Sequence, residues 1–517
     1  MRDSIDSAGK VSDTINNRDL TDKMNRNQQH TDRSEQEEAI SPSRNAIASL
    51  KEKTNQFSET AGRKPRILVS GMESSGLDQT IKSVASFFSE SGFDVDISLV
   101  QQPPRKIAEM AVENDVHFVC ISTPGSVTPT HLHLLTDALN SEEGKEIGVI
   151  IGGNNSESEQ RALYHAGAAG VLSLNRLATD TNEWFNRVQA EPRLPGDWQY
   201  YVDGVLQGNK RIVSKAITLI ESSLPSHLST ARKVIDHLLP RAGHAMRIGI
   251  SGVPGVGKST FIESFGKKLI REGYRTAVLA IDPSSSITGG SIMGDKTRME
   301  ALTLEQNVFI RPSPAGTMLG GVARKTRETI VVCEAAGFDM IIVETVGVGQ
   351  SESTVASMVD FFLVMLLAGA GDEIQGIKRG ILELADAIAI NKADGDNIEK
   401  AREAKRDYQS ALSILYPSSP VWTPSVLTCS ALTLDGLDEI WKTILDHRER
   451  LEAAGELAEK RRKQAISWMW DLIQEELKAR FFRNEAIMRL LPKIIEDVKD
   501  GKTVSSIASR ELLSLNK

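Results

Sequence analysis

The stretch GVPGVGKS at residues 252–259 satisfies the pattern G-x-x-x-x-G-K-[ST] in full. Residues 246–251 (MRIGIS) before it are apolar and β-prone, and residues 260–269 after it place apolar side chains at helical spacing. In a strand, loop and helix of this kind the glycines let successive backbone N–H groups turn toward one anion at the positive end of the helix. The stretch therefore predicts a phosphate-binding loop in an α/β domain.

The residue types of this loop assign roles to its members. Lys258 is expected to reach the β- and γ-phosphates of a nucleotide, and Ser259 to ligate Mg²⁺. The residues predicted to bind the nucleotide here are Gly252, Pro254, Gly255, Val256, Gly257, Lys258, Ser259 and Thr260.

Three acidic residues follow at places where such a site needs carboxylates. Asp282 ends a predicted strand over residues 275–282, Glu344 directly follows another over residues 340–343, and Asp295 lies in a polar, glycine-rich segment that suits a mobile switch better than a core element. A carboxylate there polarises Mg²⁺ or its water, and the N–H of Gly347 is placed to sense the γ-phosphate. The predicted metal-binding residues are Ser259, Asp282, Asp295 and Glu344.

The choice of base is indicated by the tetrad NKAD at residues 391–394, directly after a predicted strand. An aspartate carboxylate pairs with the two guanine donors N1 and N2, and adenine offers no such pair, so an unpaired carboxylate costs on the order of 1–3 kcal/mol or more. Residues 426–431 (VLTCSA) are expected to form the next strand and to present the O6 edge. The predicted guanine-side residues are Asn391, Lys392, Asp394, Ser430, Ala431 and Leu432.

Composition bounds the rest of the chain. Its 517 residues leave room for about three domains, and a net charge of −8 without a dense basic stripe argues against a nucleic-acid partner. The three cysteines (Cys120, Cys333 and Cys429) lie far apart in apolar stretches, which fits a reducing cytoplasm. The longest apolar run, residues 361–371, is too short for a membrane helix and is predicted to be a buried strand. The N-terminus has no apolar core for a secretory signal.

Two segments precede the nucleotide domain. Residues 1–63 are rich in Ser, Asp, Asn, Gln and Arg and are expected to be a disordered tail. Residues 64–190 alternate strand and helix patterns through about five units, which predicts a doubly wound parallel sheet whose ligand side is formed by the loops at 71–76, 123–128 and 152–155.

This second segment resembles the cobalamin-binding domain of acyl-CoA mutases. The resemblance rests on residues 92–97 (GFDVDI), 102–105 (QPPR), 115–117 (DVH), 122–123 and the paired glycines 152–153. That family's first loop carries D-x-H-x-x-G, whose histidine is the lower cobalt ligand; here both Asp and His are missing, and Met72 stands where the histidine is expected. Either the domain is a degenerate one that docks or scaffolds, or it holds cobalamin without a protein histidine.

The region from about residue 205 to 480 resembles the MeaB/ArgK family of metallochaperone-type P-loop GTPases, which includes the methylmalonic aciduria type A protein. The resemblance rests on the phosphate loop and on DPSS (282–285), GDKTRM (294–299), RPSP (311–314), ETVGVGQSE (344–352) and NKAD (391–394). It implies that Lys258, Asp282, Asp295 and Glu344 are the catalytic and Mg²⁺-organising set. It also implies that residues 368–380, with Asp372, Gln375 and Lys378, are a switch that transmits the nucleotide state to a mutase.

Some roles stay open at this point. Gln350 is one candidate for positioning the attacking water. No obvious arginine finger is encoded; Arg298, Arg324 and Arg327 are candidates, and intrinsic turnover is expected to be slow.

Helical patterns flank the nucleotide domain on both sides. A linker and helical lead-in are predicted over residues 191–245, before a nucleotide domain at 246–452. Residues 453–517 are predicted to be a helical arm whose Trp468, Leu472, Ile473 and Leu477 form a buried stripe. In the resembling family this arm dimerises, so a homodimer is expected; the alternative is a helix that packs within its own chain.

Together these patterns predict a Mg²⁺-dependent GTPase that acts as a chaperone for an adenosylcobalamin-dependent acyl-CoA mutase on a separate chain, with neither nucleic acid nor membrane as a partner. Two rivals are a cobalamin carrier or sensor switched by GTP, and a metal-insertion GTPase. Relatives of the second kind usually carry clustered Cys or His.

Overall fold

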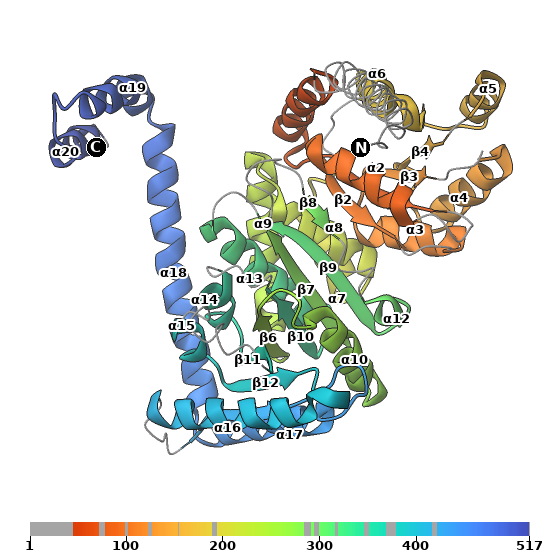
Figure 1. Ribbon diagram of the computed structural model, residues 1–517. Helices are drawn as coiled ribbons and strands as arrows, with labels where there is room; N and C mark the ends of the chain where they lie inside the picture. The colour runs from red at the N-terminus through yellow and green to blue at the C-terminus, as the bar shows by residue number, and fades with distance from the viewer. Residues whose placement is uncertain are drawn as a thin grey trace, which may run out of the picture.

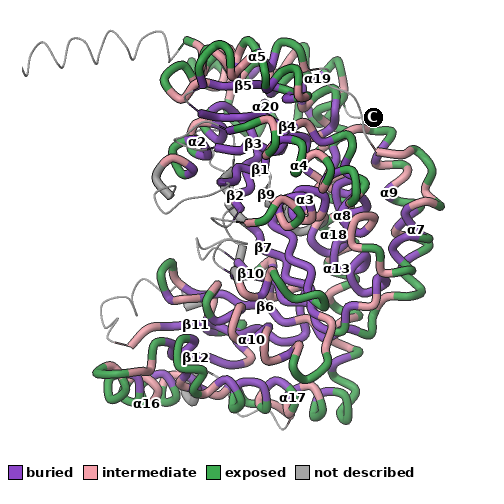
Figure 2. The backbone as a smooth tube through the Cα atoms, turned by 90° about the vertical axis from the view of Figure 1, so that its right-hand side faces the viewer, coloured by how far each residue is buried: buried purple, intermediate pink, exposed green. Residues whose placement is uncertain are grey.

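The structure is a computed structural model that describes residues 45–71, 78–98, 102–122, 127–153, 155–188, 194–283, 291–293, 299–315, 319–345, 351–368, 379–415 and 421–515. The chain forms two parallel β-sheets with helices packed on their faces, as predicted for doubly wound α/β domains (Figure 1). The strand residues whose burial is described are mostly buried in both sheets, whereas the outer sides of the surrounding helices are exposed (Figure 2).

The N-terminal sheet has the strand order β5-β4-β3-β1-β2-β8. Its first five strands follow the flavodoxin-like order, in which ligands bind at the carboxyl ends of the strands. The strands are β1 (Arg66–Ser70), β2 (Asp94–Ile97), β3 (Phe118–Ser122), β4 (Gly148–Gly152), β5 (Gly170–Leu172) and β8 (Ser291–Met293). The helices of this part are α2 (Asp78–Glu90), α3 (Pro104–Glu113), α4 (Pro129–Ser141), α5 (Glu157–His165) and α6 (Leu177–Phe185).

Strand β8 corrects one prediction. It lies within the polar segment expected to be a mobile switch, yet it pairs with β2 of the N-terminal sheet, with Asp94 opposite Ser291 and Asp96 opposite Met293. A strand of only three residues (Ser-Ile-Met) is too short to show a hydrophobic period, and its pairing is set by a partner far away in the sequence. Residues 291–293, which lie between Asp282 and Asp295 in the sequence, are therefore part of the seam between the two sheets.

The second sheet has the strand order β13-β12-β11-β6-β10-β7-β9. Its strands are β6 (Met246–Gly252), β7 (Thr276–Pro283), β9 (Val308–Ala315), β10 (Met340–Glu344), β11 (Phe361–Leu367), β12 (Ala387–Asn391) and β13 (Ser425–Thr428). Its helices are α10 (Lys258–Arg271), α12 (Glu300–Thr303), α13 (Leu319–Ala335), α14 (Ser351–Ala356), α15 (Arg379–Leu382), α16 (Ile398–Leu415) and α17 (Leu437–Ala453). Because β6 lies between β11 and β10, the loop that follows β6 is surrounded by the ends of both neighbours.

Two features of this sheet bear on the predictions. The run expected to be a buried strand is confirmed as β11, whose residues are almost fully buried. Strand β13 ends at Thr428, so Cys429, Ser430 and Ala431 form a loop after the strand rather than its end. This matters for the site, because these residues then turn toward the phosphate loop.

The segment before the second sheet is helical, as expected, and consists of α7 (Trp198–Leu206), α8 (Lys210–Glu221) and α9 (Pro225–Leu238). The face of α8 that bears Val213, Ala216, Ile217 and Ile220 is fully buried in the core shared with α13 and the strands. Helix α8 also lies against α3 of the N-terminal part, so it packs between the two sheets.

Residues 45–61 form a helix, which corrects the prediction of a disordered tail over residues 1–63. Leu50, Phe57 and Ala61 are buried in the core of the N-terminal sheet, and Thr54 donates to the carbonyl of Ser91. The helix is stable because these four positions recur at helical spacing on one side. The N-terminal part therefore begins earlier than predicted; residues 1–44 lie outside the described residues.

The C-terminal arm consists of α18 (Glu456–Arg483), α19 (Glu485–Lys499) and α20 (Ser505–Ser514), and it extends well beyond the second sheet (Figure 1). The first turns of α18 are held down by Arg461, which makes a bidentate ion pair with the buried Asp360. The predicted buried stripe is wrong for the outer half of the helix: Ile473 is 39% and Leu477 54% exposed. None of the described helices is long and apolar enough to cross a membrane.

Candidate active site

The loop after β6 needs glycine at two positions. Gly252 has a φ of +156°, and a Cβ there would lie 2.4 Å from the Met365 carbonyl oxygen of β11. Gly257 has a φ of +92°, and its Cβ would lie 2.8 Å from Nδ2 of Asn391. The loop can therefore pass between the neighbouring strand and the base-side loop only without side chains at these positions. Its last residue leads directly into α10, whose N-terminus provides the positive end of a helix dipole.

Lys258 is the first residue of α10, and its side chain turns back into this loop. It is 8% exposed, and its Nζ donates to the carbonyl oxygens of Gly252, at 2.7 Å, and Val253, at 3.3 Å. The ammonium group is thus held inside the turn by the loop's own carbonyls. A phosphate bound by the loop would lie near this ammonium group, and a small movement of the Lys258 side chain would bring the two into contact. Contact with the phosphates is the role that the sequence predicts for Lys258.

Two of the four residues expected to organise the metal come together, Ser259 in the first turn of α10 and Glu344 at the end of β10. Ser259 Oγ donates to Oε1 of Glu344 at 3.4 Å, and Glu344 is 7% exposed. The next residue, Thr345, is fully buried and donates from Oγ1 to Oγ of Ser251 at 2.9 Å. This hydroxyl pair ties the end of β10 to the end of β6, so it fixes the backbone from which Glu344 projects.

Asn391 connects the base-side loop to the phosphate loop. Its Nδ2 donates to the Val256 carbonyl at 2.8 Å, and its Oδ1 accepts from the N–H of Ala431 at 3.1 Å. The Ala431 carbonyl in turn accepts from Oγ of Ser264 on α10 at 2.8 Å. The phosphate loop, Asn391, Ala431 and the phosphate-loop helix therefore form a closed ring of hydrogen bonds that sets the distance between the phosphate and base ends of the site.

Asp394 lies next to this ring. Its Oδ2 accepts a hydrogen bond from the Ser430 hydroxyl, and the Ser430 Oγ accepts from the N–H of Thr433 at 3.1 Å. Lys392 adopts a φ of +59°, and Ala393 N–H donates to the Cys429 carbonyl at 3.0 Å. These bonds hold the carboxylate at the mouth of the base side. Burial raises the pKa of the neighbouring Cys429 thiol to about 12, so this group stays neutral beside Asn391.

The structure brings most of the predicted residues together. Thr260 and Lys392 lie at the edge of the site, and Leu432 is 79% exposed. Asp282 lies in β7, with its backbone opposite Pro314, and its side chain is outside the described set. The other predicted residues that lie outside the described residues are Met72, Asp295, Arg298, Gly347, Gln350, Asp372, Gln375 and Lys378, together with the side chain of Arg324.

Arg327 is not placed as an arginine finger. It is 7% exposed, and its guanidinium donates to Oγ of Ser357 at 2.7 Å and to the Gln464 carbonyl at 3.2 Å, with the Trp468 ring centroid 5.8 Å from its Cζ. The side chain therefore joins α13, the end of α14 and the arm helix α18. Ser264 and Thr345 are site residues that the sequence does not reveal, because each acts through a tertiary contact that no local pattern announces.

The N-terminal sheet has its own polar side chains at the carboxyl ends of its strands. Ser70 Oγ accepts from Oγ of Ser98 at 2.6 Å, and both are buried. The Ser122 hydroxyl and the side-chain amide of Asn155 are buried with no hydrogen-bond partner among the described residues. His117 lies at the opposite end of the sheet, just before β3, where its Nδ1 accepts from the N–H of Arg66 at 2.9 Å. It is therefore not placed to ligate a metal at the carboxyl edge.

Both parts of the chain match known families. The family described as methylmalonyl Co-A mutase-associated GTPase MeaB matches residues 213–486, and the B12 binding domain matches residues 65–174. The chain is 46% identical over 306 residues to the GTPase ArgK of Escherichia coli, covering 59% of this chain and 92% of that protein. It is 45% identical over 317 residues to the mitochondrial methylmalonic aciduria type A homolog of Mus musculus, covering 59% of this chain and 76% of that protein.

Among solved structures, a crystal structure of a LAO/AO transport system kinase is similar to this chain, with a TM-score of 0.50 and 39% sequence identity. The similarity covers 61% of this chain and 96% of that one. The phosphate loop, the guanine tetrad and the family match agree, so the hydrolysis of GTP is the activity of this site. The chain belongs to the MeaB family of P-loop GTPases and carries a B12-binding domain before its GTPase domain.

Proposed function

We propose that this chain is a Mg²⁺-dependent GTPase that serves an adenosylcobalamin-dependent acyl-CoA mutase as a chaperone, gating the loading, protection or repair of its cofactor. The observation that carries the proposal is the presence of a mutase-associated GTPase and a B12-binding domain in one chain. A GTPase fused to a fold that recognises cobalamin is suited to controlling the traffic of that cofactor.

The donors at the site support Mg²⁺ as the metal. The Ser259 hydroxyl, in the first turn of α10, meets the Glu344 carboxylate at the end of β10, and hard oxygen ligands of this kind are those that Mg²⁺ prefers. We assign the metal to Ser259 and Glu344 together with Asp282 and Asp295. Held by these residues, Mg²⁺ would supply positive charge that neutralises the phosphates of the nucleotide. Lys258 would contribute the remaining positive charge at the γ-phosphate, and Gly347 its N–H.

The mutase partner can be tested by affinity capture. The full-length chain would be immobilised with Mg²⁺ and either GDP or a non-hydrolysable GTP analogue, and exposed to an extract of the cells that contain it. We expect an acyl-CoA mutase to be captured in a nucleotide-dependent manner, with Asp372, Gln375 and Lys378 as the switch residues that transmit the state. If no mutase is retained with either nucleotide, the chaperone role is wrong and only the GTPase stands.

The N-terminal domain either docks another molecule or binds cobalamin, and the side chains at the edge of its sheet bear on both possibilities. The buried Ser122 hydroxyl and Asn155 amide, which have no partner among the described residues, are suited to forming hydrogen bonds with a polar ligand at the carboxyl edge. Against a His-ligated cofactor, His117 is at the other end of the sheet and Met72 replaces the family histidine. We therefore propose a docking or scaffolding role, with cobalamin bound without a protein histidine as the second candidate.

A visible spectrum separates these two candidates. Pure full-length protein would be mixed with adenosylcobalamin and passed through a desalting column. Absence of the cobalamin absorbance from the protein peak supports the docking role. A stoichiometric amount in the peak supports the carrier or sensor role, and Asn155→Ala should then reduce the bound amount while leaving GTP hydrolysis unchanged.

The arm supports a homodimer. Ile466, Met469, Trp470, Ile473 and Leu477 recur at helical spacing on α18 and are between 39% and 56% exposed. An apolar stripe of this kind on an extended helix is a surface for another helix. Light scattering behind size exclusion should give the mass of two chains, and Trp470→Asp should reduce it to one chain, whereas Lys463→Asp on the same helix should not. A wild-type protein with the mass of one chain would contradict the proposal.

A further inference from the structure

Strand β8 connects the nucleotide site to the N-terminal sheet through the backbone. It comes from the segment that follows Asp282 and precedes Asp295, and it forms the sixth strand of the N-terminal sheet by pairing with β2. It also lies against β7 and β9 of the GTPase sheet and against α2. Residues 291–293, which lie in the sequence between two of the predicted metal-binding residues, are thus an integral strand of the sheet of the other domain.

A buried arginine makes the second connection. Arg66 on β1 is 3% exposed and forms a bidentate pair with Asp96 on β2, at 2.7 Å and 3.0 Å. Its Nη2 also donates to the Pro312 carbonyl of β9 at 3.1 Å. Strand β9 pairs in register with β7, so that Pro312 lies opposite Ala280 and Pro314 opposite Asp282. The guanidinium therefore holds β9 close to the strand end that carries Asp282.

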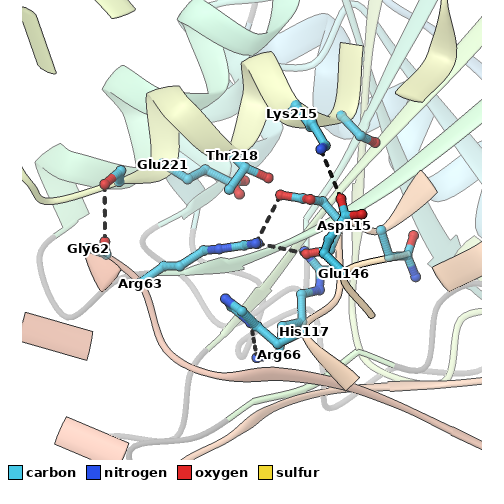
Figure 3. A network of polar contacts seen from close by, with 12 residues as sticks. Gly62, Arg63, Arg66, Asp115, His117, Glu146, Lys215, Thr218 and Glu221 are labelled. Atoms are coloured by element: carbon cyan, nitrogen blue, oxygen red, sulfur yellow. Dashed lines mark hydrogen bonds and ion pairs between the residues drawn. The ribbon is translucent and has the colours of Figure 1, made fainter. Parts of the chain in front are cut away.

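A third connection runs from β9 through α8. Arg311 is fully buried and donates to the Asn114 carbonyl of the N-terminal part at 3.2 Å and to Oε2 of Glu221 at 2.7 Å. The other oxygen of Glu221 accepts from Oγ of Ser313 at 2.6 Å. Figure 3 shows Glu221 and Thr218 on α8 facing Arg63 and Asp115 of the N-terminal part. The positive charges of Arg63 and Arg311 are therefore paired with the carboxylates of Asp115 and Glu221 at the boundary between the two sheets.

From these contacts we infer that the N-terminal domain is an in-cis regulator of the GTPase: the state of the nucleotide and the state of the N-terminal sheet are coupled through β8 and through Arg66, Arg311 and Ser313. Coupling requires an element that both sites bias. Strand β8 meets that requirement because it pairs with β2 of the N-terminal sheet and also lies against β7 and β9 of the GTPase sheet. The end of β9 meets it because Pro312 bonds Arg66 of the N-terminal sheet while β9 pairs with β7, the strand that carries Asp282. The coupling is reciprocal, so whatever occupies the N-terminal sheet also changes nucleotide affinity.

Hydrogen exchange on the full-length protein tests the coupling directly. Amide exchange would be followed in the nucleotide-free protein, with Mg²⁺ and GDP, and with Mg²⁺ and a non-hydrolysable GTP analogue. We expect the exchange rates in β1, β2 and β8 to differ between the two nucleotide states. Peptides from α19 and α20 serve as a reference within the chain. Identical exchange in β1 and β2 with both nucleotides, while the phosphate loop responds, would overturn the inference.

Two variants locate the coupling on β9. Arg66→Lys removes the planar guanidinium that bonds both Asp96 and Pro312. Ser313→Ala removes only the hydrogen bond to Glu221. The second variant keeps the test valid if the first one folds poorly. The control is Arg161→Lys, since Arg161 is exposed and pairs with Glu157 within α5, outside the seam. We expect the dissociation constant of fluorescent GDP to change by about fivefold or more in the first two variants and by less than about twofold in the control. Unchanged affinity in both Arg66→Lys and Ser313→Ala would place regulation elsewhere.

Discussion

The carboxyl edges of the two parallel sheets differ in how their polar side chains are used. At the GTPase sheet, Asn391 bonds both the phosphate loop and the loop of Ala431. At the N-terminal sheet, the Ser122 hydroxyl and the Asn155 amide are buried without a described partner. The same architecture thus carries one site whose residues bond one another and one whose buried polar groups have no partner among the described residues. Two sheets of the same fold can therefore differ in function, because function depends on the side chains at the carboxyl edge of the sheet.

The largest expected effect comes from the lysine of the GTPase site. Lys258→Ala should lower the rate of GTP hydrolysis by about 100-fold or more, because a preorganised positive charge at the transferring phosphoryl group is lost. Lys267→Ala on the same helix, where the side chain pairs with Glu263 at the surface, is the control and should leave the rate unchanged. Phosphate release under single-turnover conditions gives the rate. A Lys258 variant that keeps most of its activity would refute the assignment of this loop.

The next effect tests the ring of hydrogen bonds. Asn391→Ala leaves the Val256 carbonyl and the Ala431 N–H without these bonds, and each unpaired buried group costs about 1–3 kcal/mol. We expect GDP to bind about 10- to 100-fold more weakly by calorimetry. Asn209→Ala, which removes the N-cap of α8, should lower thermal stability instead, without changing GDP affinity. Equal GDP affinity in wild type and Asn391→Ala would mean that the ring does not shape the site.

The seam between the sheets should make stability depend on acid pH. Burial alone would raise the pKa of Glu221, but Arg311 and the Ser313 hydroxyl outweigh it and hold this pKa below the ordinary carboxyl range. A depressed pKa in the folded state stabilises the fold above the unfolded value of about 4.3, and this contribution is lost as the pH falls below it. Urea unfolding should therefore show stability falling below about pH 4.5. The fall should be shallower in Glu221→Gln, and parallel curves for the two proteins would contradict this account.

The smallest effect is expected at the N-terminal edge. Removing a buried hydroxyl that has no partner costs little or nothing, so Ser122→Ala should be neutral or slightly stabilising in the absence of a ligand. Its rate of GTP hydrolysis should match that of wild type. A loss of more than about 1 kcal/mol in urea unfolding would show that Ser122 already has a partner within the chain.

The sequence predicts the site where its chemistry is local and fails where it is tertiary. The phosphate loop and the guanine tetrad are recognisable because their residues are contiguous and each motif follows a strand. Ser264 and Thr345 cannot be found this way, since their partners Ala431 and Ser251 lie far away in the chain. Strand β8 escapes prediction because three residues in a polar, glycine-rich segment are too few to show a hydrophobic period, and their pairing depends on β2.

The wrong prediction for residues 45–61 could have been avoided from the sequence itself. The polar composition of residues 45–61 predicts a disordered tail, yet Leu50, Thr54, Phe57 and Ala61 recur at helical spacing and are all buried. The arm shows the opposite case: its apolar spacing is real, but spacing alone does not say whether the covering partner is the same chain. Trp470 is 56% exposed within one chain, so the stripe is not part of this chain's core.

The most direct test of the GTPase site concerns its base. The dissociation constants of GDP and of xanthosine diphosphate would be measured for the wild type and for Asp394→Asn. Because the carboxylate of Asp394 is held at the base end by Ser430, we predict that wild type prefers GDP and that the variant reverses the preference toward the xanthine nucleotide. A variant that still prefers GDP, or a wild type that binds ADP as tightly as GDP, would contradict a guanine-specific site.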